Sequence, residues 1–83
     1  MLLDEIDCAI RNVLGEYSKV DDLDKLSDGE DLYRMGMTSH AVVNVMLALE
    51  EEFDVVFPDR MLQKSTFVSI DAIRAAINEL CEQ

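Results

Sequence analysis

The chain has 83 residues, 49% of them hydrophobic, and a formal net charge of -11 from 18 acidic and 7 basic side chains. This length corresponds to one domain that buries roughly 60% of the surface its unfolded chain exposes, which leaves little room for a deep active-site cleft. The charge argues against nucleic acid and anionic membrane surfaces as partners, because both would repel it, and favours partners with basic surfaces.

Targeting signals and cysteines add two expectations. No apolar run approaches the ~20 residues that span a bilayer, and residues 1–5 lack the basic leader of a signal peptide. We therefore expect a cytoplasmic monomer with a single domain over residues 1–83. Cys8 and Cys81 are interpreted as reduced, packed thiols, with a disulfide between them as the alternative. Their spacing does not fit a zinc site.

The first predicted helix covers residues 3–17, and Asp4 and Glu5 suit its positive end. Its apolar residues recur at helical spacing: Leu3, Ile6, Ile10, Val13, Leu14 and Tyr17. Residues 18–38 are rich in Ser, Asp and Gly, and we interpret them as a long ordered loop. The loop contains four scattered apolar residues, Val20, Leu23, Leu26 and Leu32, and its leucines would pin it to the core. Such a long loop is uncommon unless it is functional. Its acidic residues fail the calcium-loop pattern, because position 12 counted from Asp22 is Tyr33.

The second predicted helix covers residues 39–53. Its core stripe follows helical spacing: Val42, Val45, Met46, Leu49 and Phe53. Val43 and Leu47 lie off this stripe, beside Glu50 and Glu51, and form an apolar strip with an acidic end. The strip is either part of a helix that is apolar around much of its girth, or a docking face for a partner.

The C-terminal part of the chain predicts two further helical elements. Pro58 prevents continuation of the second helix, and residues 59–62 suit one short helical turn. Ser65, Thr66 or Ser69 would cap a last helix whose apolar face is Ile70, Ile73, Ile77 and Leu80. No stretch alternates as a strand does. The expected fold class is all-α, a small bundle of three main helices plus one short helix, with a long loop between the first two main helices.

Ser39 lies in the segment Gly36-Met37-Thr38-Ser39-His40, where the second helix begins. It is either the N-cap of that helix, in an unmodified acidic protein-interaction module, or the attachment point of a covalent arm. A phosphate on Ser39 would face the positive end of the helix and its free amide groups. Nucleophilic catalysis by Ser39 and His40 is disfavoured, because adjacent residues on a helix do not face each other.

A family resemblance rests on three features in order and spacing. Gly36 and Ser39 come first, Leu49-Glu50-Glu51-Glu52-Phe53 follows, and Pro58-Asp59 comes last. They resemble the acyl carrier protein family, whose signature is Gly-x-Asp-Ser-Leu, a helix ending in Leu-Glu-Glu-Glu-Phe, and an apolar-Pro-Asp turn. The resemblance covers nearly the whole chain.

The resemblance implies a carrier and not an enzyme. A phosphopantetheinyl transferase would attach 4'-phosphopantetheine from coenzyme A to Ser39, with Mg²⁺ in the transferase, and the thiol of the arm would hold the cargo as a thioester. An acyl- or aminoacyl-loading ligase and downstream transferases of fatty acid or secondary metabolite biosynthesis would dock through basic patches. The docking residues implied are His40, Val43, Leu47, Glu50 and Glu51, with Gly36 and Thr38 as motif support.

Two departures from the signature leave the transferase open: Thr38 replaces the usual Asp, and His40 replaces the usual Leu. A narrower resemblance rests on Asp31-Leu32-Tyr33, Phe57-Pro58-Asp59 and Phe67-x-Ser69-Ile70. These segments look like the small bacterial carriers that are loaded with an amino acid by ligases similar to aminoacyl-tRNA synthetases.

Overall fold

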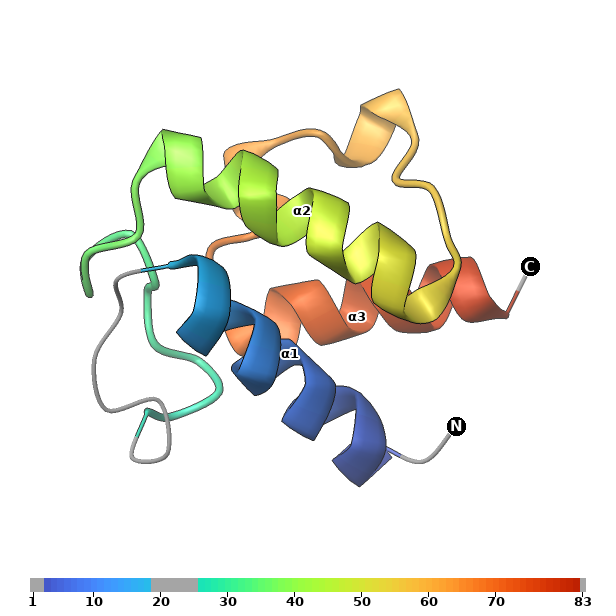
Figure 1. The fold of residues 1–83 in the computed structure, drawn as a ribbon, viewed down its shortest axis with the longest axis horizontal. Coiled ribbons are helices and arrows are strands. Elements are labelled where there is room, and N and C mark those ends of the chain that lie inside the picture. The colour runs from blue at the N-terminus through green and yellow to red at the C-terminus, as the bar shows by residue number, and fades with distance from the viewer. Residues whose placement is uncertain (1–2, 19–25, 83) are drawn as a thin grey trace.

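The computed structural model describes residues 3–18 and 26–82. Within these ranges the chain forms three α-helices, α1 (Leu3–Tyr17), α2 (Ser39–Phe53) and α3 (Ile70–Cys81), and two short 3-10 helices, η2 (Asp59–Met61) and η3 (Lys64–Thr66). Helix α1 packs against both α2 and α3 (Figure 1). The predicted all-α class is therefore confirmed, and the described ranges contain no strand.

The helix boundaries agree with the sequence predictions at most points. The predicted ranges 3–17 and 39–53 coincide with α1 and α2, and the predicted turn at 59–62 is η2. Ser69 is the cap of α3, since its Oγ accepts a hydrogen bond from the backbone N–H of Ala72 at 3.1 Å. Helix η3 was not predicted, because a single 3-10 turn is too short to produce a periodic pattern.

One contiguous core joins the three α-helices, η2 and the described segments between them. Its buried apolar side chains are Ile6, Ile10, Val13, Leu14, Leu26, Leu32, Met37, Ala41, Val45, Leu49, Phe53, Phe57, Met61, Phe67, Ile70, Ile73, Ala76 and Ile77. The predicted stripe of α2 was wrong at two positions. Val42 and Met46 are only partly buried, and Ala41 is buried in their place. The fully buried stripe therefore keeps Val45, Leu49 and Phe53 and is narrower than predicted, and the face with Val42 and Met46 looks toward the segment between η2 and α3.

The described part of the long loop is held in place by buried leucines and by backbone hydrogen bonds. Leu26 and Leu32 are buried, as predicted, whereas Val20 and Leu23 lie outside the described residues. The N–H of Leu32 donates to the carbonyl oxygen of Val68 at 2.7 Å. These contacts fix the loop against the start of α3.

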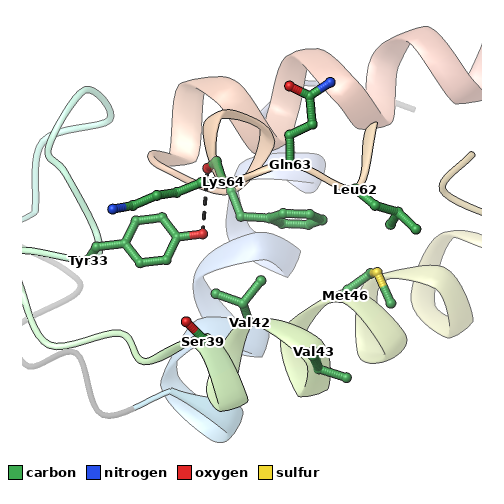
Figure 2. A pocket seen from close by; sticks show the side chains of 9 residues that line it. Tyr33, Ser39, Val42, Val43, Met46, Leu62, Gln63 and Lys64 are labelled. Atoms are coloured by element: carbon green, nitrogen blue, oxygen red, sulfur yellow. Dashed lines mark hydrogen bonds between the residues drawn. The ribbon is translucent and has the colours of Figure 1, made fainter. Parts of the chain in front are cut away.

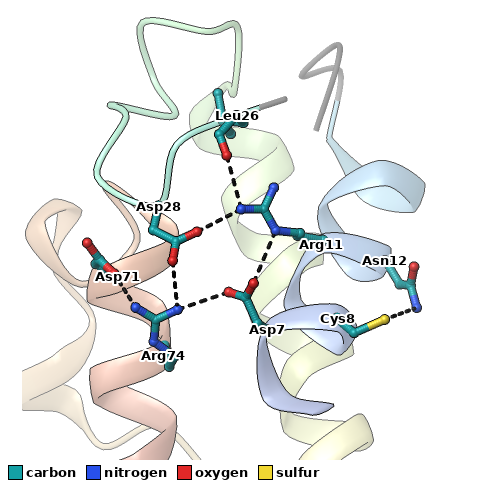
Figure 3. Close-up of polar contacts among 8 residues, drawn as sticks. All are labelled: Asp7, Cys8, Arg11, Asn12, Leu26, Asp28, Asp71 and Arg74. Atoms are coloured by element: carbon teal, nitrogen blue, oxygen red, sulfur yellow. Dashed lines mark hydrogen bonds and ion pairs between the residues drawn. The ribbon is translucent and has the colours of Figure 1, made fainter. Parts of the chain in front are cut away.

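A network of ion pairs joins this loop to two helices (Figure 3). Asp28 accepts from Arg11 of α1 at 2.7 Å and from Arg74 of α3 at 3.1 Å. Asp7 also pairs with both arginines, at 3.3 and 3.0 Å, and Asp71 pairs with Arg74. The hydrogen bond from Arg74 is the largest influence on Asp28 and holds the pKa of its carboxyl below the usual value, with a smaller contribution from Arg11.

The turn after α2 is built from Asp54 and Glu50. Asp54 has a left-handed backbone with φ 54°, and its N–H donates to the carbonyl oxygen of Glu50. The side chain of Glu50 accepts from the N–H of Phe57 at 2.8 Å. The rings of Phe57 and Phe67 then meet edge to face, with centroids 5.4 Å apart. Glu50 therefore helps to position the segment that follows α2.

Both cysteines are free and exposed, so the interpretation of Cys8 and Cys81 as packed thiols was wrong. The alternative disulfide is also absent. Each residue lies on the outer face of its helix, where helical spacing turns it away from the core. Among the described residues, no helix has the length and apolar character to cross a membrane.

Candidate functional site

Ser39 is the first residue of α2, and its side chain is exposed. Within the described ranges, its hydroxyl has no hydrogen-bond partner. The hydroxyl is thus accessible, and no existing contact has to be broken before it can react.

Thr38, and not Ser39, caps α2. Thr38 has an extended backbone, with φ -89° and ψ 164°, and its Oγ1 accepts from the N–H of Ala41 at 3.1 Å. The N-cap is the last non-helical residue, and this geometry satisfies one of the free amide groups at the helix start. The alternative interpretation of Ser39 as only an N-cap was therefore wrong. A threonine oxygen here performs the capping that the aspartate of the family signature could perform.

Gly36 shapes the approach to Thr38. Its φ of 116° lies in a region that side chains disfavour. The turn it ends is closed by the N–H of Met37, which donates to the carbonyl oxygen of Leu32 at 3.0 Å, and Met37 is buried. The glycine of the motif therefore lets the chain turn so that Met37 enters the core and Ser39 remains outside.

Ser39 lies at the edge of a groove of ≈ 430 Å³, which we call the Ser39 groove (Figure 2). The groove lies between α2 and the segment 62–67. Its lining residues are Tyr33, Ser39, Val42, Val43, Met46, Leu62, Gln63, Lys64 and Phe67. Figure 2 shows Ser39, Tyr33 and Lys64 at one end and Leu62 and Met46 toward the other. The groove is thus apolar along most of its length and polar at the end that holds Ser39.

The polar end has two weak internal contacts. The hydroxyl of Tyr33 donates to the carbonyl oxygen of Lys64 at 3.5 Å, and the ammonium of Lys64 lies 4.8 Å from the centroid of the Tyr33 ring. Burial raises the pKa of the Tyr33 hydroxyl, with a smaller contribution from the charge of Asp31. The hydroxyl therefore remains a protonated donor at neutral pH.

Most of the predicted docking residues form one exposed face of α2. His40, Val43, Leu47 and Glu51 are exposed, with exposed fractions of 51% for Val43 and 53% for Leu47. Glu50 is only partly buried, but its carboxylate is already engaged by Phe57. The spacing of these residues places them on one side of the helix. Their role in docking stays a prediction.

The lining of the groove by Leu62, Lys64 and Phe67 was not predicted. These residues are separated from Ser39 by more than one element, and no periodic pattern connects them to α2. Tyr33 also lines the groove, and it is partly buried against the core. Among the described residues, no cluster of His, Cys, Asp and Glu could hold a metal ion.

Comparisons with known proteins bear on this site. Residues 8–77 match the model of the family described as "Phosphopantetheine attachment site". The chain is 37% identical over 73 residues to the aminoacyl carrier protein of Agrobacterium fabrum (strain C58 / ATCC 33970), which covers 87% of this chain and 88% of the relative.

Two solved structures are also similar. One is a chain in the crystal structure of an engineered Bradyrhizobium japonicum glycine:[carrier protein] ligase complexed with a carrier protein from Agrobacterium tumefaciens and ATP. It matches with a TM-score of 0.84 and 36% identity, over 89% of this chain and 97% of that chain. The other is a solution structure of an Agrobacterium tumefaciens protein, with a TM-score of 0.72 and 35% identity, over 92% of this chain and 93% of that chain.

Proposed function

Because the chain belongs to the phosphopantetheine attachment site family, we propose that it is an aminoacyl carrier whose 4'-phosphopantetheine arm is attached to Ser39. The family shows that the chain is a phosphopantetheine carrier. The aminoacyl cargo is proposed from the relative that is an aminoacyl carrier protein and from the similar structure of a carrier protein with a glycine ligase.

The observation that carries the attachment at Ser39 is its exposed hydroxyl, which has no hydrogen-bond partner among the described residues. In the proposed reaction, Ser39 Oγ attacks the coenzyme A phosphorus that bears pantetheine, and the new P–O bond replaces the bond to adenosine 3',5'-bisphosphate. The serine proton passes to a base of the transferase, which also binds the Mg²⁺. Thr38 keeps its cap throughout, so modification does not disturb the start of α2.

The Ser39 groove supports the same proposal. Its apolar walls lie directly beside the serine, and they suit the apolar part of a pantetheine chain. When attached, the arm supplies a terminal thiol that holds an amino acid as a reactive thioester. The chain itself supplies the attachment point and the surfaces that enzymes recognise, and we propose no catalytic residue in it.

The partners follow from the exposed face of α2. We propose that a loading ligase docks on His40, Val43, Leu47 and Glu51, with apolar contact at the centre and the acidic end facing basic residues of the ligase. Glu50 contributes negative charge to this face while it holds Phe57. A phosphopantetheinyl transferase and a downstream acceptor enzyme complete the set of partners. A monomer in the cytoplasm stays the expected form.

The test is the intact mass of the protein after incubation with coenzyme A, Mg²⁺ and a broad-specificity phosphopantetheinyl transferase. We expect the gain of one phosphopantetheine, its loss in Ser39→Ala, and its retention in Ser65→Ala, which removes another exposed serine. A gain that persists in Ser39→Ala would place the arm elsewhere. Loading by an aminoacyl ligase and ATP should then add one amino acid to the modified protein alone.

A further inference from the structure

Among the described residues, Lys64 is the one charged residue that lines the Ser39 groove, and it is a cation in a protein of net charge -11. The other described bases that make ion pairs are all engaged away from the groove: Arg11 and Arg74 with the network around Asp28, and Arg60 with Glu79. The ammonium of Lys64 has no carboxylate within ion-pair distance among the described residues. Its charge is therefore available to an anion that enters the groove.

Tyr33 adds a hydrogen-bond donor beside this cation. Its hydroxyl points toward the carbonyl oxygen of Lys64 (Figure 2) and makes a bond of 3.5 Å, far longer than the usual O–H···O distance of about 2.7 Å. The backbone N–H of Tyr33 donates to Asp31 Oδ1 at 2.9 Å, which holds the residue in the turn. Both side-chain contacts between Tyr33 and Lys64 are weak, so both groups can exchange them for a stronger partner.

We propose that Lys64 and Tyr33 bind the phosphodiester of the arm attached to Ser39, and so direct the arm into the groove. The inference rests on the proposed function. A phosphodiester carries one negative charge at neutral pH and has two free oxygens, which match one ammonium and one hydroxyl. Hydrogen bonds to a charged acceptor are shorter and stronger than those to a neutral carbonyl oxygen. Binding of the phosphate by Tyr33 and Lys64 is therefore favoured over the weak contacts that these two residues make with each other.

The position of these groups gives the arm a direction. Ser39, Lys64 and Tyr33 share one end of the groove, and Val42, Met46 and Phe67 continue the lining beyond them. A phosphate held at the polar end leaves the apolar part of the arm beside this lining. Since Lys64 is exposed, the attraction is screened by salt, and the arm can leave when a partner enzyme offers a better site.

The experiment starts from the modified protein, with one phosphopantetheine verified by intact mass. Its ³¹P NMR resonance is followed as the salt concentration rises to about 1 M, where the Debye length falls to about 3 Å. We expect a salt-dependent shift in the wild type, reduced to less than about half in Lys64→Gln because the screened charge is gone. Arg34→Gln is the matched control, since it removes an exposed base of the neighbouring turn that does not line the groove.

A second readout tests Tyr33. In the modified wild type, ring protons of Tyr33 should show nuclear Overhauser contacts to the arm, and Tyr33→Phe should change the ³¹P shift while it keeps the ring. Equal salt dependence in wild type, Lys64→Gln and Arg34→Gln, with no such contacts, would overturn this inference and leave the carrier function intact. A protein that gains no phosphopantetheine would overturn both.

Discussion

The backbone N–H of Ala41 donates to Thr38 Oγ1 at 3.1 Å, so the residue before Ser39 closes the start of α2. Capping and the proposed modification are thereby assigned to two adjacent side chains. This separation means that the two functions can be removed one at a time, which a serine serving both roles would not permit.

Substitution of Thr38 should lower stability, whereas substitution of Ser39 should prevent modification. Thr38→Ala should lower the free energy of unfolding by about 0.5–2 kcal/mol, because it removes the N-cap. Ser39→Ala should change it by less than about 0.5 kcal/mol but abolish modification by the transferase. Thr38→Asp keeps a capping oxygen and should restore stability. Urea unfolding and intact mass measure the two properties, and an equal loss of stability in Thr38→Ala and Ser39→Ala would contradict the assignment.

Gly36→Ala should destabilise the protein by about 1 kcal/mol or more, because the φ of 116° is unfavourable for a residue with a side chain. Gly29→Ala is the matched control. An added Cβ there would meet Asp71 at an ordinary contact distance of 3.8 Å. Thermal unfolding of the two variants checks this. A Gly36→Ala protein as stable as Gly29→Ala would show that the backbone at position 36 does not require glycine.

The two neighbouring acids of α2 should behave differently. Glu50→Ala leaves the N–H of Phe57 without its acceptor and should cost about 1–3 kcal/mol of stability. Glu51→Lys should leave stability within about 0.5 kcal/mol, because exposed charges contribute little, but it should weaken loading by the ligase. Unfolding curves and the kcat/KM of the ligase separate the two effects. Unchanged loading of Glu51→Lys would remove that residue from the docking face.

The apolar part of the docking face gives a further expectation. Leu47→Ser should lower the rate of loading at least about tenfold if the side chain is central to the interface, since interface anchors carry most of the binding energy. Val56→Ser is the control, because Val56 is also an exposed apolar residue, but it lies outside α2 and does not line the Ser39 groove. Circular dichroism should show both variants folded, and equal loading rates would argue against docking through Leu47.

Asp28 should make the free energy of unfolding depend on pH in the acidic range. Its pKa is lowered in the folded protein, chiefly by the hydrogen bond from Arg74, so the folded state binds the proton less readily than the unfolded state. The contribution is complete above the ordinary carboxyl pKa of 3.8 and is lost as the pH falls through the lower folded value. Asp28→Asn should therefore flatten the fall in unfolding free energy below about pH 4.

The control for Asp28 is Glu30→Gln, at an exposed acid that makes no ion pair among the described residues. Denaturant unfolding at a series of pH values compares the three proteins. If Asp28→Asn and Glu30→Gln showed the same slope as the wild type, the network would have no part in acid stability.

Local patterns predicted the helices well, and long-range contacts were predicted poorly. The spacing of Ile70, Ile73 and Ile77 and the capping ability of Ser69 are properties of consecutive residues, and the structure confirms them. The placement of Lys64 in the same groove as Ser39 depends instead on how η3 packs against α3. No single segment contains that information. The same reason explains the error at Val42 and Met46, since their partial burial depends on what lies opposite α2.

The same contrast between local patterns and long-range contacts holds for the candidate site. Ser39 and Gly36 were predicted because they stand at fixed distances in one short motif. The identity of the cap was open, because Thr38 and Ser39 can both accept a hydrogen bond, and only the backbone angles of Thr38 decide between them. The hydrogen bond from the N–H of Phe57 to the carboxylate of Glu50 could not be predicted from the sequence either, because it depends on the left-handed turn at Asp54.

Within the described residues, every ion pair joins α1, α3, η2 or the loop, and none includes a residue of α2. Helix α2 is held by its buried stripe, by Thr38 and by the turn at its end. Its outward residues can therefore be exchanged as a set without dismantling the charged scaffold behind them. If partners dock on α2 as we propose, grafting the outward side chains of another carrier onto this helix should redirect the protein to that carrier's ligase without a loss of stability.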